Sequence, residues 1–203
     1  MGSEPFAREF FERDPDLVAH ELIGTHLVLR GDEAIVRVRI VETEAYGGLD
    51  DPASHSFRGP TPRSRIMFGP PGYVYVYRSY GIHWCMNVVT QPEGTASAVL
   101  IRAGEIVEIA PAGAGPRAAS VMLRGPGVFT RELGITGADN GEDCCEGVGG
   151  RLYFTRSGDD EDVPVGRSLR IGITRGRERP SRYFQIGHPA VSKNPSPNVP
   201  TDG

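Results

Sequence analysis

The chain has 203 residues, which suits one domain of ordinary size, and 38% of them are hydrophobic, enough to build a core. Charged residues make up 24%, so the composition is globular and excludes a wholly disordered chain. No apolar run approaches the roughly 20 residues that span a bilayer, and the N-terminus lacks the basic start and apolar stretch of a signal peptide. We therefore expect a cytoplasmic protein with no membrane partner.

The first half of the chain is predicted to form one helix and then a run of strands. Asp14 and Pro15 are typical of a helix start, as an N-cap acid and a proline at the first helical position, and Gly24 ends the helix. Apolar alternation and β-branched or aromatic runs indicate strands at Thr25–Leu29, Ala34–Tyr46, Tyr73–Tyr77, Trp84–Thr90 and Ser97–Arg102. Because the links between them are short, we expect an antiparallel sheet.

The second half of the chain is less regular. One or two short helices are expected within residues 117–135, around the break at Arg124–Gly127. The acidic, glycine-rich segment 137–150 is expected to be a loop. Two further strands are predicted, at 151–156 and 168–174.

The domain organisation follows from what the chain lacks. It has no internal repeat and no second composition regime, so we predict a single mixed α+β domain over residues 1–193. The tail 194–203 carries three prolines and no large apolar anchor beyond Val199, so we expect it to be disordered.

The three cysteines predict neither a disulfide framework nor a metal site. Cys144 and Cys145 are adjacent in sequence and could be bridged only with strain. His83 and Cys85 could offer two metal ligands, but no second pair stands nearby in sequence. We therefore expect free thiols and no structural zinc.

The net charge of −4 hides two basic segments. Residues 53–92 contain four arginines and no carboxylate, and residues 164–193 contain seven cations and one acid. The compensating acids crowd into residues 139–162. Because a polyanion responds to the local potential, this pattern permits a phosphate-binding face. Arginines that are merely solvated would explain the charge pattern equally well.

Glu42 and Glu44 are the first candidates for chemistry. They are two residues apart on one predicted strand, so they share a face at a separation of roughly 7 Å. Inverting glycosidases space their carboxyl groups similarly, at about 6.5–9.5 Å, although ion pairing with a nearby arginine would also explain either glutamate. Tyr46 follows on the same face, and His55 lies in an acid-free loop. A carboxylate beside stackable rings suits a site that holds a planar base and hydrolyses its bond to a sugar.

Tyrosines and arginines alternate in the next part of the chain. Tyr73 and Tyr75 are best explained as a packing face of a strand, whereas Tyr80 lies past the strand, where a turn would expose its ring. Exposed aromatic side chains near arginines recur where bases stack and phosphates bind. The sequence contains no phosphate-binding Walker motif, zinc-deaminase pattern or G-x-S-x-G motif.

Four ordered motifs resemble the alkyladenine (3-methyladenine) DNA glycosylase family, and the chain looks like a bacterial member. The motifs are Arg39–Tyr46, Asp51–His55, Met67–Gly72 and Tyr73–Gly81 with its continuation to Asn87. The resemblance covers roughly residues 8–192. It implies a curved antiparallel sheet similar to that of the C-terminal domain of methionyl-tRNA formyltransferase. It also implies hydrolysis of the bond between a damaged purine and its sugar in double-stranded DNA, by a monomer without metal or cofactor.

The resemblance also implies roles for single residues. Glu44 matches the general base that activates water, and Arg102 matches the arginine that positions that water and the carboxylate. The residues that match the pocket for the flipped base are Tyr46, His55, Tyr77, Asn87 and Ile173. Alkylated purines that carry a positive charge are expected to stack well on the tyrosine faces, by about 0.5–2 kcal/mol.

Outside the pocket, Tyr80 matches the wedge that fills the gap left in the duplex. The arginines expected to contact the DNA backbone are Arg58, Arg63, Arg65 and Arg78. The protein would thus be a monofunctional glycosylase that starts base excision repair in the bacterial nucleoid.

Two other functions remain open at the level of sequence. A nucleic-acid-binding module without activity would bind damaged DNA and release no base. A hydrolase of small nucleosides or glycosides would act on free nucleosides and would depend little on salt.

Overall fold

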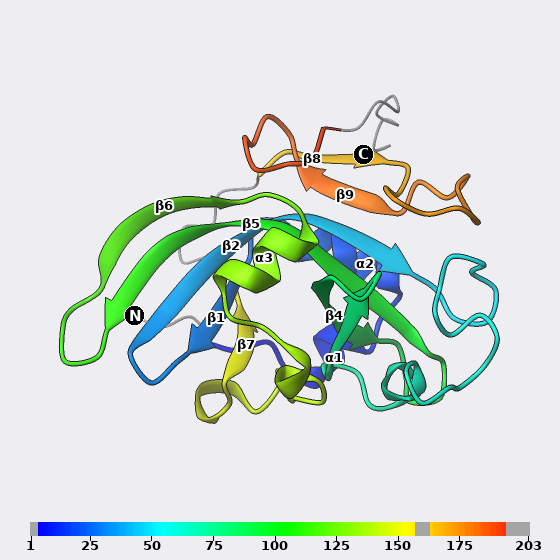
Figure 1. Cartoon of the computed structure of the whole chain (residues 1–203), viewed down its shortest axis with the longest axis horizontal. Coiled ribbons are helices and arrows are strands. Elements are labelled where there is room, and N and C mark those ends of the chain that lie inside the picture. Colours follow the sequence, from blue (N-terminus) through cyan, green and yellow to red (C-terminus); the bar gives the residue numbers. More distant parts are fainter. Residues whose placement is uncertain (1–3, 157–162, 194–203) are drawn as a thin grey trace.

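In the computed structural model, residues 4–156 and 163–193 are described, and they form a curled antiparallel sheet with a few short helices (Figure 1). The main path of the sheet runs β3-β4-β5-β2-β1-β7, while β6 pairs with β5, and β9 pairs with both β2 and β8. The strands are β1 His26–Arg30, β2 Ala34–Tyr46, β3 Val74–Ser79, β4 His83–Thr90, β5 Ser97–Pro111, β6 Arg117–Leu123, β7 Leu152–Thr155, β8 Val165–Ser168 and β9 Arg182–Gln185.

Strand β2 changes partner along its length, and this change places the candidate carboxylates. Its first part pairs with β1, and from Glu42 to Glu44 it pairs with β9 instead. Irregularities in its register with β5 next to Glu42 bend the strand where the partner changes. Because β5 and β9 flank this part of β2, Glu42 and Glu44 are both fully buried.

The helices pack against the sheet through one shared core. In Figure 1, the long strands arch over α1 (Arg8–Phe11) and α2 (Pro15–Glu21). The predicted start of α2 is confirmed, because the Asp14 side chain accepts a hydrogen bond from the amide of Asp16. Helix α3 (Pro126–Glu132) lies against β4 and β5, and its Phe129 enters the main core.

The prediction of helices over residues 117–135 was only half right. Residues 126–132 form α3, but residues 117–123 form β6, which pairs with β5. Strand β5 runs to Pro111, well beyond the predicted end at Arg102, so it offers a long edge. Pairing with that edge overrides the helix propensity of the alanine, methionine and leucine residues in β6.

The predicted strand at 168–174 is wrong, and β9 was missed. Strand β8 ends at Ser168, and the next residues leave the sheet. Gly172 and Gly176 have φ values of 76° and 58°, a left-handed backbone that breaks a strand. Of the remaining segments, 137–150 is a loop that contains two short 3₁₀ turns, η2 (Gly137–Asp139) and η3 (Gly147–Gly149).

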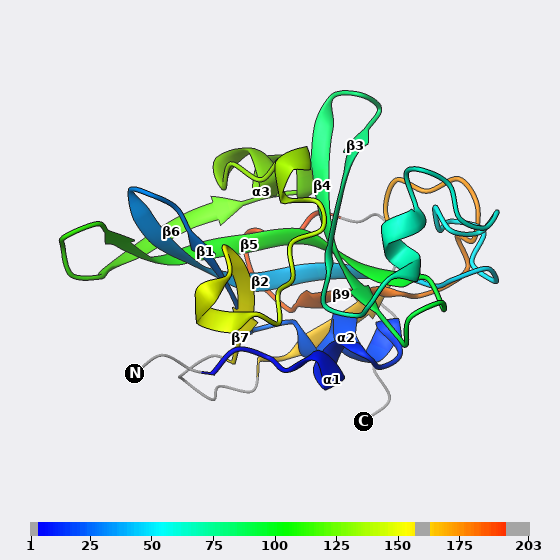
Figure 2. The same cartoon turned by 90° about the horizontal axis from the view of Figure 1, so that it is seen from below.

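The other predicted strands are confirmed, and apart from the C-terminal end of β5 their ends differ from the prediction by at most two residues. The predicted disordered tail, 194–203, lies outside the described residues. Figure 2 shows the β3–β4 hairpin projecting from the body of the sheet. In the described ranges, no helix has the length and apolar character that a membrane crossing requires.

Candidate active site

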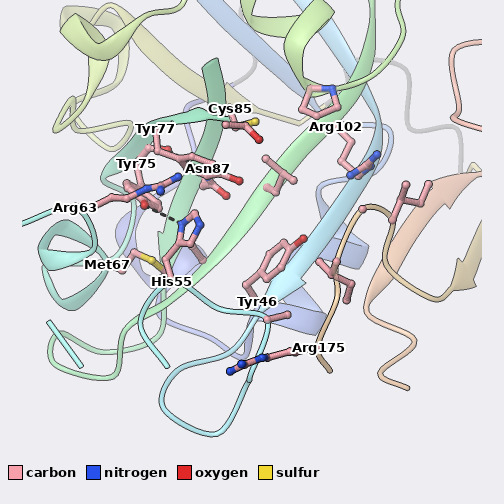
Figure 3. Close-up of a pocket in the computed structure, with 18 of the residues that line it drawn as sticks. Tyr46, His55, Arg63, Met67, Tyr75, Tyr77, Cys85, Asn87, Arg102 and Arg175 are labelled. Atoms are coloured by element: carbon pink, nitrogen blue, oxygen red, sulfur yellow. Dashed lines mark hydrogen bonds between the residues drawn. The ribbon is translucent and has the colours of Figure 1, made fainter. Parts of the chain in front are cut away.

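A cavity of about 650 Å³ opens beside the β3–β4 end of the sheet (Figure 3). It is lined by strands β3, β4 and β5, by the loop after β2 and by the segment after β8. Eight of the residues predicted from sequence line it: Tyr46, His55, Arg63, Tyr77, Tyr80, Asn87, Arg102 and Ile173. The fold thus brings together residues from distant parts of the chain.

Glu44 lies just beneath the cavity wall and is held by three donors. Its Oε2 atom accepts hydrogen bonds from the Tyr46 hydroxyl at 2.8 Å and from Arg102 Nη1 at 3.1 Å. Its Oε1 atom accepts one from the amide of Ile171 at 2.7 Å. A carboxylate offers about four lone-pair positions, so these three donors leave one position unfilled. The three donors all line the cavity, so the carboxylate is one hydrogen bond from its surface.

Glu42 has a different environment from Glu44. Its Oε1 atom accepts from Arg102 Nε at 2.9 Å and from Arg182 Nε at 2.8 Å, and its Oε2 atom accepts from the amide of Ser192. Burial alone would raise the pKa of Glu42, but the charges of Arg102 and Arg182 outweigh it and hold the pKa below its ordinary value. A carboxylate fixed by two arginines is a structural anion and not a second acid or base.

Arg102 joins the two glutamates through one guanidinium group. Its side chain is 8% exposed, and it reaches the cavity from β5. Burial would lower the pKa of Arg102, but the charges of Glu44 and Glu42 more than offset this and raise it. The arginine therefore stays charged and fixes the position of Glu44.

Tyr46 connects the carboxylate to a second, unpredicted ion pair. Burial and the neighbouring charge of Glu44 raise the pKa of Tyr46 well above its usual range, so its hydroxyl stays a donor. The guanidinium of Arg170 lies 4.7 Å from the centroid of its ring. Arg170 also forms two hydrogen bonds with Asp51, and both of these charged side chains are fully buried.

The Asp51–Arg170 ion pair connects the loop after β2 with the segment after β8. Asp51 accepts from the amides of Gly47 and Ala53, and Arg170 donates to the carbonyl of Gly176. The pair thus fixes the segment that carries Ile171 and its hydrogen bond to Glu44. Sequence reasoning missed Arg170 because no local pattern distinguishes a buried arginine from the other cations of this segment.

His55, Tyr75 and Tyr77 form an aromatic wall. His55 Nδ1 is 3.0 Å from the Tyr75 hydroxyl, and its ring meets the Tyr77 ring edge-on with centroids 4.5 Å apart. Although His55 is partly exposed, packing against the two tyrosines desolvates its ring, and this, with a smaller contribution from the charge of Arg63, lowers the pKa of His55 to about 4. The ring is therefore neutral at pH 7. Tyr75 was predicted as a packing residue and is buried, yet it also lines the cavity.

Asn87 and Tyr80 both line the cavity but differ in exposure. Asn87 is almost fully buried, and its amide nitrogen donates a 3.0 Å hydrogen bond to the carbonyl of Tyr75, which fixes the orientation of the side chain. Tyr80 is 89% exposed at the tip of the β3–β4 hairpin, with φ at 50°, and Ile82 beside it is 68% exposed. The predicted exposure of Tyr80 is confirmed.

The four arginines expected at the DNA backbone do not share one environment. Arg58 and Arg65 are exposed and form no ion pair within the described part of the chain. The guanidinium of Arg78 lies over the ring of Trp84. Arg63 lies at the cavity rim, 4.7 Å from the centroid of the Tyr77 ring. Among the described residues, no group of three or more His, Cys, Asp or Glu side chains could hold a metal ion.

Comparison with known proteins gives a consistent result. The family model of the methylpurine-DNA glycosylases matches residues 9–189. A relative from Frankia casuarinae, named "Putative 3-methyladenine DNA glycosylase", is 44% identical over 98% of this chain and 97% of its own. Relatives of the same name from Bradyrhizobium diazoefficiens and a Synechococcus species are also 44% identical, over 94% and 92% of this chain and 92% and 98% of their own.

Proposed function

The chain belongs to the methylpurine-DNA glycosylase family, whose members hydrolyse N-glycosyl bonds in DNA, and we propose that its cavity receives a damaged purine flipped out of the duplex. The observation that carries this proposal is the contact of Arg102 and Tyr46, both in the cavity wall, with the buried carboxylate of Glu44. These contacts connect one carboxylate to a space that is lined by aromatic rings.

Glu44 is proposed to act as the general base. The lone pair that its three donors leave free would accept a proton from a water at the cavity floor, and the water oxygen would attack the sugar carbon as the purine leaves. The negative charge would also stabilise positive charge that develops on the sugar. A general base of this kind typically contributes ~10²–10⁴-fold to the rate. Arg102 would orient both the carboxylate and the water.

The rest of the cavity is proposed to bind and select the base. Tyr46, on one side, and His55 and Tyr77, on the other, would stack against the flipped ring, while Ile173 would complete the wall. The buried amide of Asn87 would crowd the exocyclic amino group of normal guanine. Flipping costs a few kcal/mol, least for a damaged and weakly paired base, and the exposed ring of Tyr80 would fill the gap left in the stack.

The experiment that tests this proposal uses duplexes that each carry one lesion. The protein is incubated with DNA containing 3-methyladenine, 7-methylguanine, hypoxanthine or ethenoadenine, and free base is measured by chromatography. Release from at least one duplex, with none from the matched free nucleosides, is the expected result. Binding without release would indicate a non-catalytic module, and release from nucleosides alone would indicate a small-molecule hydrolase.

Four finer features of the proposal also remain predictions. They are action as a monomer, a place in the bacterial nucleoid, a role in starting base excision repair, and a likeness of the fold to the C-terminal domain of methionyl-tRNA formyltransferase. Residues 1–193 are proposed to form the whole glycosylase domain.

A further inference from the structure

Two tyrosines of the cavity, Tyr46 and Tyr77, already have a guanidinium over the ring. Arg63 lies 4.7 Å from the centroid of Tyr77, and Arg170 lies 4.7 Å from the centroid of Tyr46. An aromatic ring attracts a cation through the negative charge of its faces, and a first cation weakens the attraction for a second. Because Asp51 balances the charge of Arg170, it is the Tyr77 ring, beside Arg63, that is the poor site for a positively charged base.

Some of the arginines around the cavity are paired with a carboxylate, and others are not. Arg170 is balanced by Asp51, and Arg102 and Arg182 together are balanced by Glu42 and Glu44. Arg63 and Arg175 also line the cavity, and within the described ranges neither forms an ion pair. The described lining residues include no aspartate or glutamate. The wall of the cavity therefore carries a net positive charge.

Arg63 is the cation best placed to act on a bound base. It is held at the rim by a 3.3 Å hydrogen bond from Nη2 to the carbonyl of Arg78, so its charge stays close to the Tyr77 ring. Its field already reaches the interior of the site, since it contributes to the lowered pKa of His55. Arg175 is also exposed at the rim, but the guanidinium that lies over the Tyr77 ring is that of Arg63.

We propose that Arg63 is a specificity-determining residue, whose charge makes the cavity select against positive charge on the purine. This inference rests on the proposed function, and it revises the expectation that cationic purines gain from stacking on the tyrosines. Neutral damaged purines, such as deaminated or etheno-bridged ones, would enter without this repulsion. Cationic N-alkylated purines would be released because their glycosidic bond is weak and not because the cavity binds them well.

The test compares one cationic and one neutral lesion in the same duplex sequence. Single-turnover rates are measured for 7-methylguanine and hypoxanthine with the wild-type chain and with Arg63→Gln, Arg63→Lys and Arg65→Gln. Removing a unit charge near a partly exposed ring should raise the ratio of the cationic to the neutral rate by about fivefold in Arg63→Gln. Arg63→Lys keeps the charge and should keep the wild-type ratio. Arg65→Gln should change both rates by the same factor, because Arg65 does not line the cavity.

Two outcomes would overturn the proposal. An unchanged ratio in Arg63→Gln would show that the charge does not select the base. An equal loss on both lesions, with a salt slope that is smaller by about 0.9, would show that Arg63 is a phosphate ligand instead. If the wild-type chain releases no base, the proposed function fails. In that case, charge selection is tested separately by binding. Dissociation constants are measured for the same two duplexes with the same variants, and the ratio between the cationic and the neutral lesion is compared.

Discussion

The amide of Ile171 donates a 2.7 Å hydrogen bond to Oε1 of Glu44, although 127 positions separate the two residues. Glu44 belongs to a central strand, and Ile171 belongs to the loop that follows β8. The carboxylate is thus oriented from the sheet by Arg102 and Tyr46 and from the loop by a backbone group. Two parts of the chain must fold together before the site has its geometry.

Substitution of Glu44 is expected to lower activity, whereas substitution of Glu42 is expected to lower stability. Glu44→Gln keeps the shape of the side chain but cannot take a proton from water, so single-turnover base release should fall by at least ~10²-fold. Binding of lesion DNA should survive, and a gel-shift or anisotropy titration with the same duplex measures it.

The matched control is Glu42→Gln, two residues earlier on β2. Two buried arginines share the Glu42 carboxylate, so its loss leaves buried charge unbalanced and should cost about 3–5 kcal/mol of unfolding free energy. Urea unfolding measures this cost, and base release is compared under conditions where both variants are folded. If Glu42→Gln lost more activity per folded molecule than Glu44→Gln, the catalytic assignment would be wrong.

Tyr80 should matter for duplex DNA and not for single strands. Tyr80→Ser removes the proposed wedge, so the flipped state should be less populated in a duplex and excision should slow. Release from a single strand that carries the same lesion should change little, because no gap needs to be filled. The ring is 89% exposed, so the midpoint of unfolding should stay the same. Equal losses on both substrates would place the role of Tyr80 in the cavity.

Salt should weaken binding steeply if arginines hold the phosphates. The slope of log affinity against log salt should become shallower by about 0.9 for each phosphate that the protein no longer neutralises. Arg58→Gln and Arg65→Gln remove exposed arginines without ion pairs in the described ranges, so each should lower the slope by that amount. Equilibrium titrations at several salt concentrations measure it. A flat dependence in the wild-type chain would favour a hydrolase of small nucleosides.

The parts of the site that lie on one strand could be predicted from the sequence. The alternation in Ala34–Tyr46 gave the correct bounds of β2, and a period of two puts Glu42, Glu44 and Tyr46 on one face, where the structure has Glu44 bonded to Tyr46. The alternation does not show that the two glutamates have different environments. That difference comes from Arg182 on β9, a four-residue strand too short and too polar to give a pattern.

The ion pair of Asp51 and Arg170 is a second contact that the sequence could not predict. The two residues are 119 positions apart, and each reads in sequence as an ordinary surface charge. Only the fold turns them into a fully buried pair that fixes both loops of the cavity. Long-range pairing of charges has no local signature, so the cavity's supporting contacts could not be predicted, although eight of its lining residues could.

His55 should make stability depend on pH between about 6.5 and 4. Its pKa falls from 6.5 to about 4 on folding, so the unfolded chain takes up a proton in this window and the folded chain does not. Stability should therefore be full above pH 6.5 and should decrease as the pH falls toward 4. Urea unfolding of the wild-type chain and His55→Asn at several pH values measures the effect. The variant should show a shallower decrease, whereas identical curves would contradict the lowered pKa.

The enzyme is expected to stop after removing the base, without cutting the strand. Glycosylases that also nick DNA form a Schiff base between an amine and the sugar, which requires a nucleophilic lysine or a terminal amine. Lys193 is the only lysine of the chain, and it is exposed. Its neighbour Ser192 donates to Glu42, but Lys193 is not among the described residues that line the cavity. Arginine cannot replace it, because its pKa lies above ~12.

Borohydride reduction during turnover tests this expectation, since it would trap a Schiff base as a covalent adduct of protein and DNA. No adduct should form, and the strand should stay intact until alkali is added. Lys193→Gln should release base at the wild-type rate, because no step of the proposed reaction uses an amine. An adduct that disappears in Lys193→Gln would identify Lys193 as a nucleophile. An adduct that persists in the variant would point to the terminal amine, and either adduct would overturn the assignment of a monofunctional glycosylase.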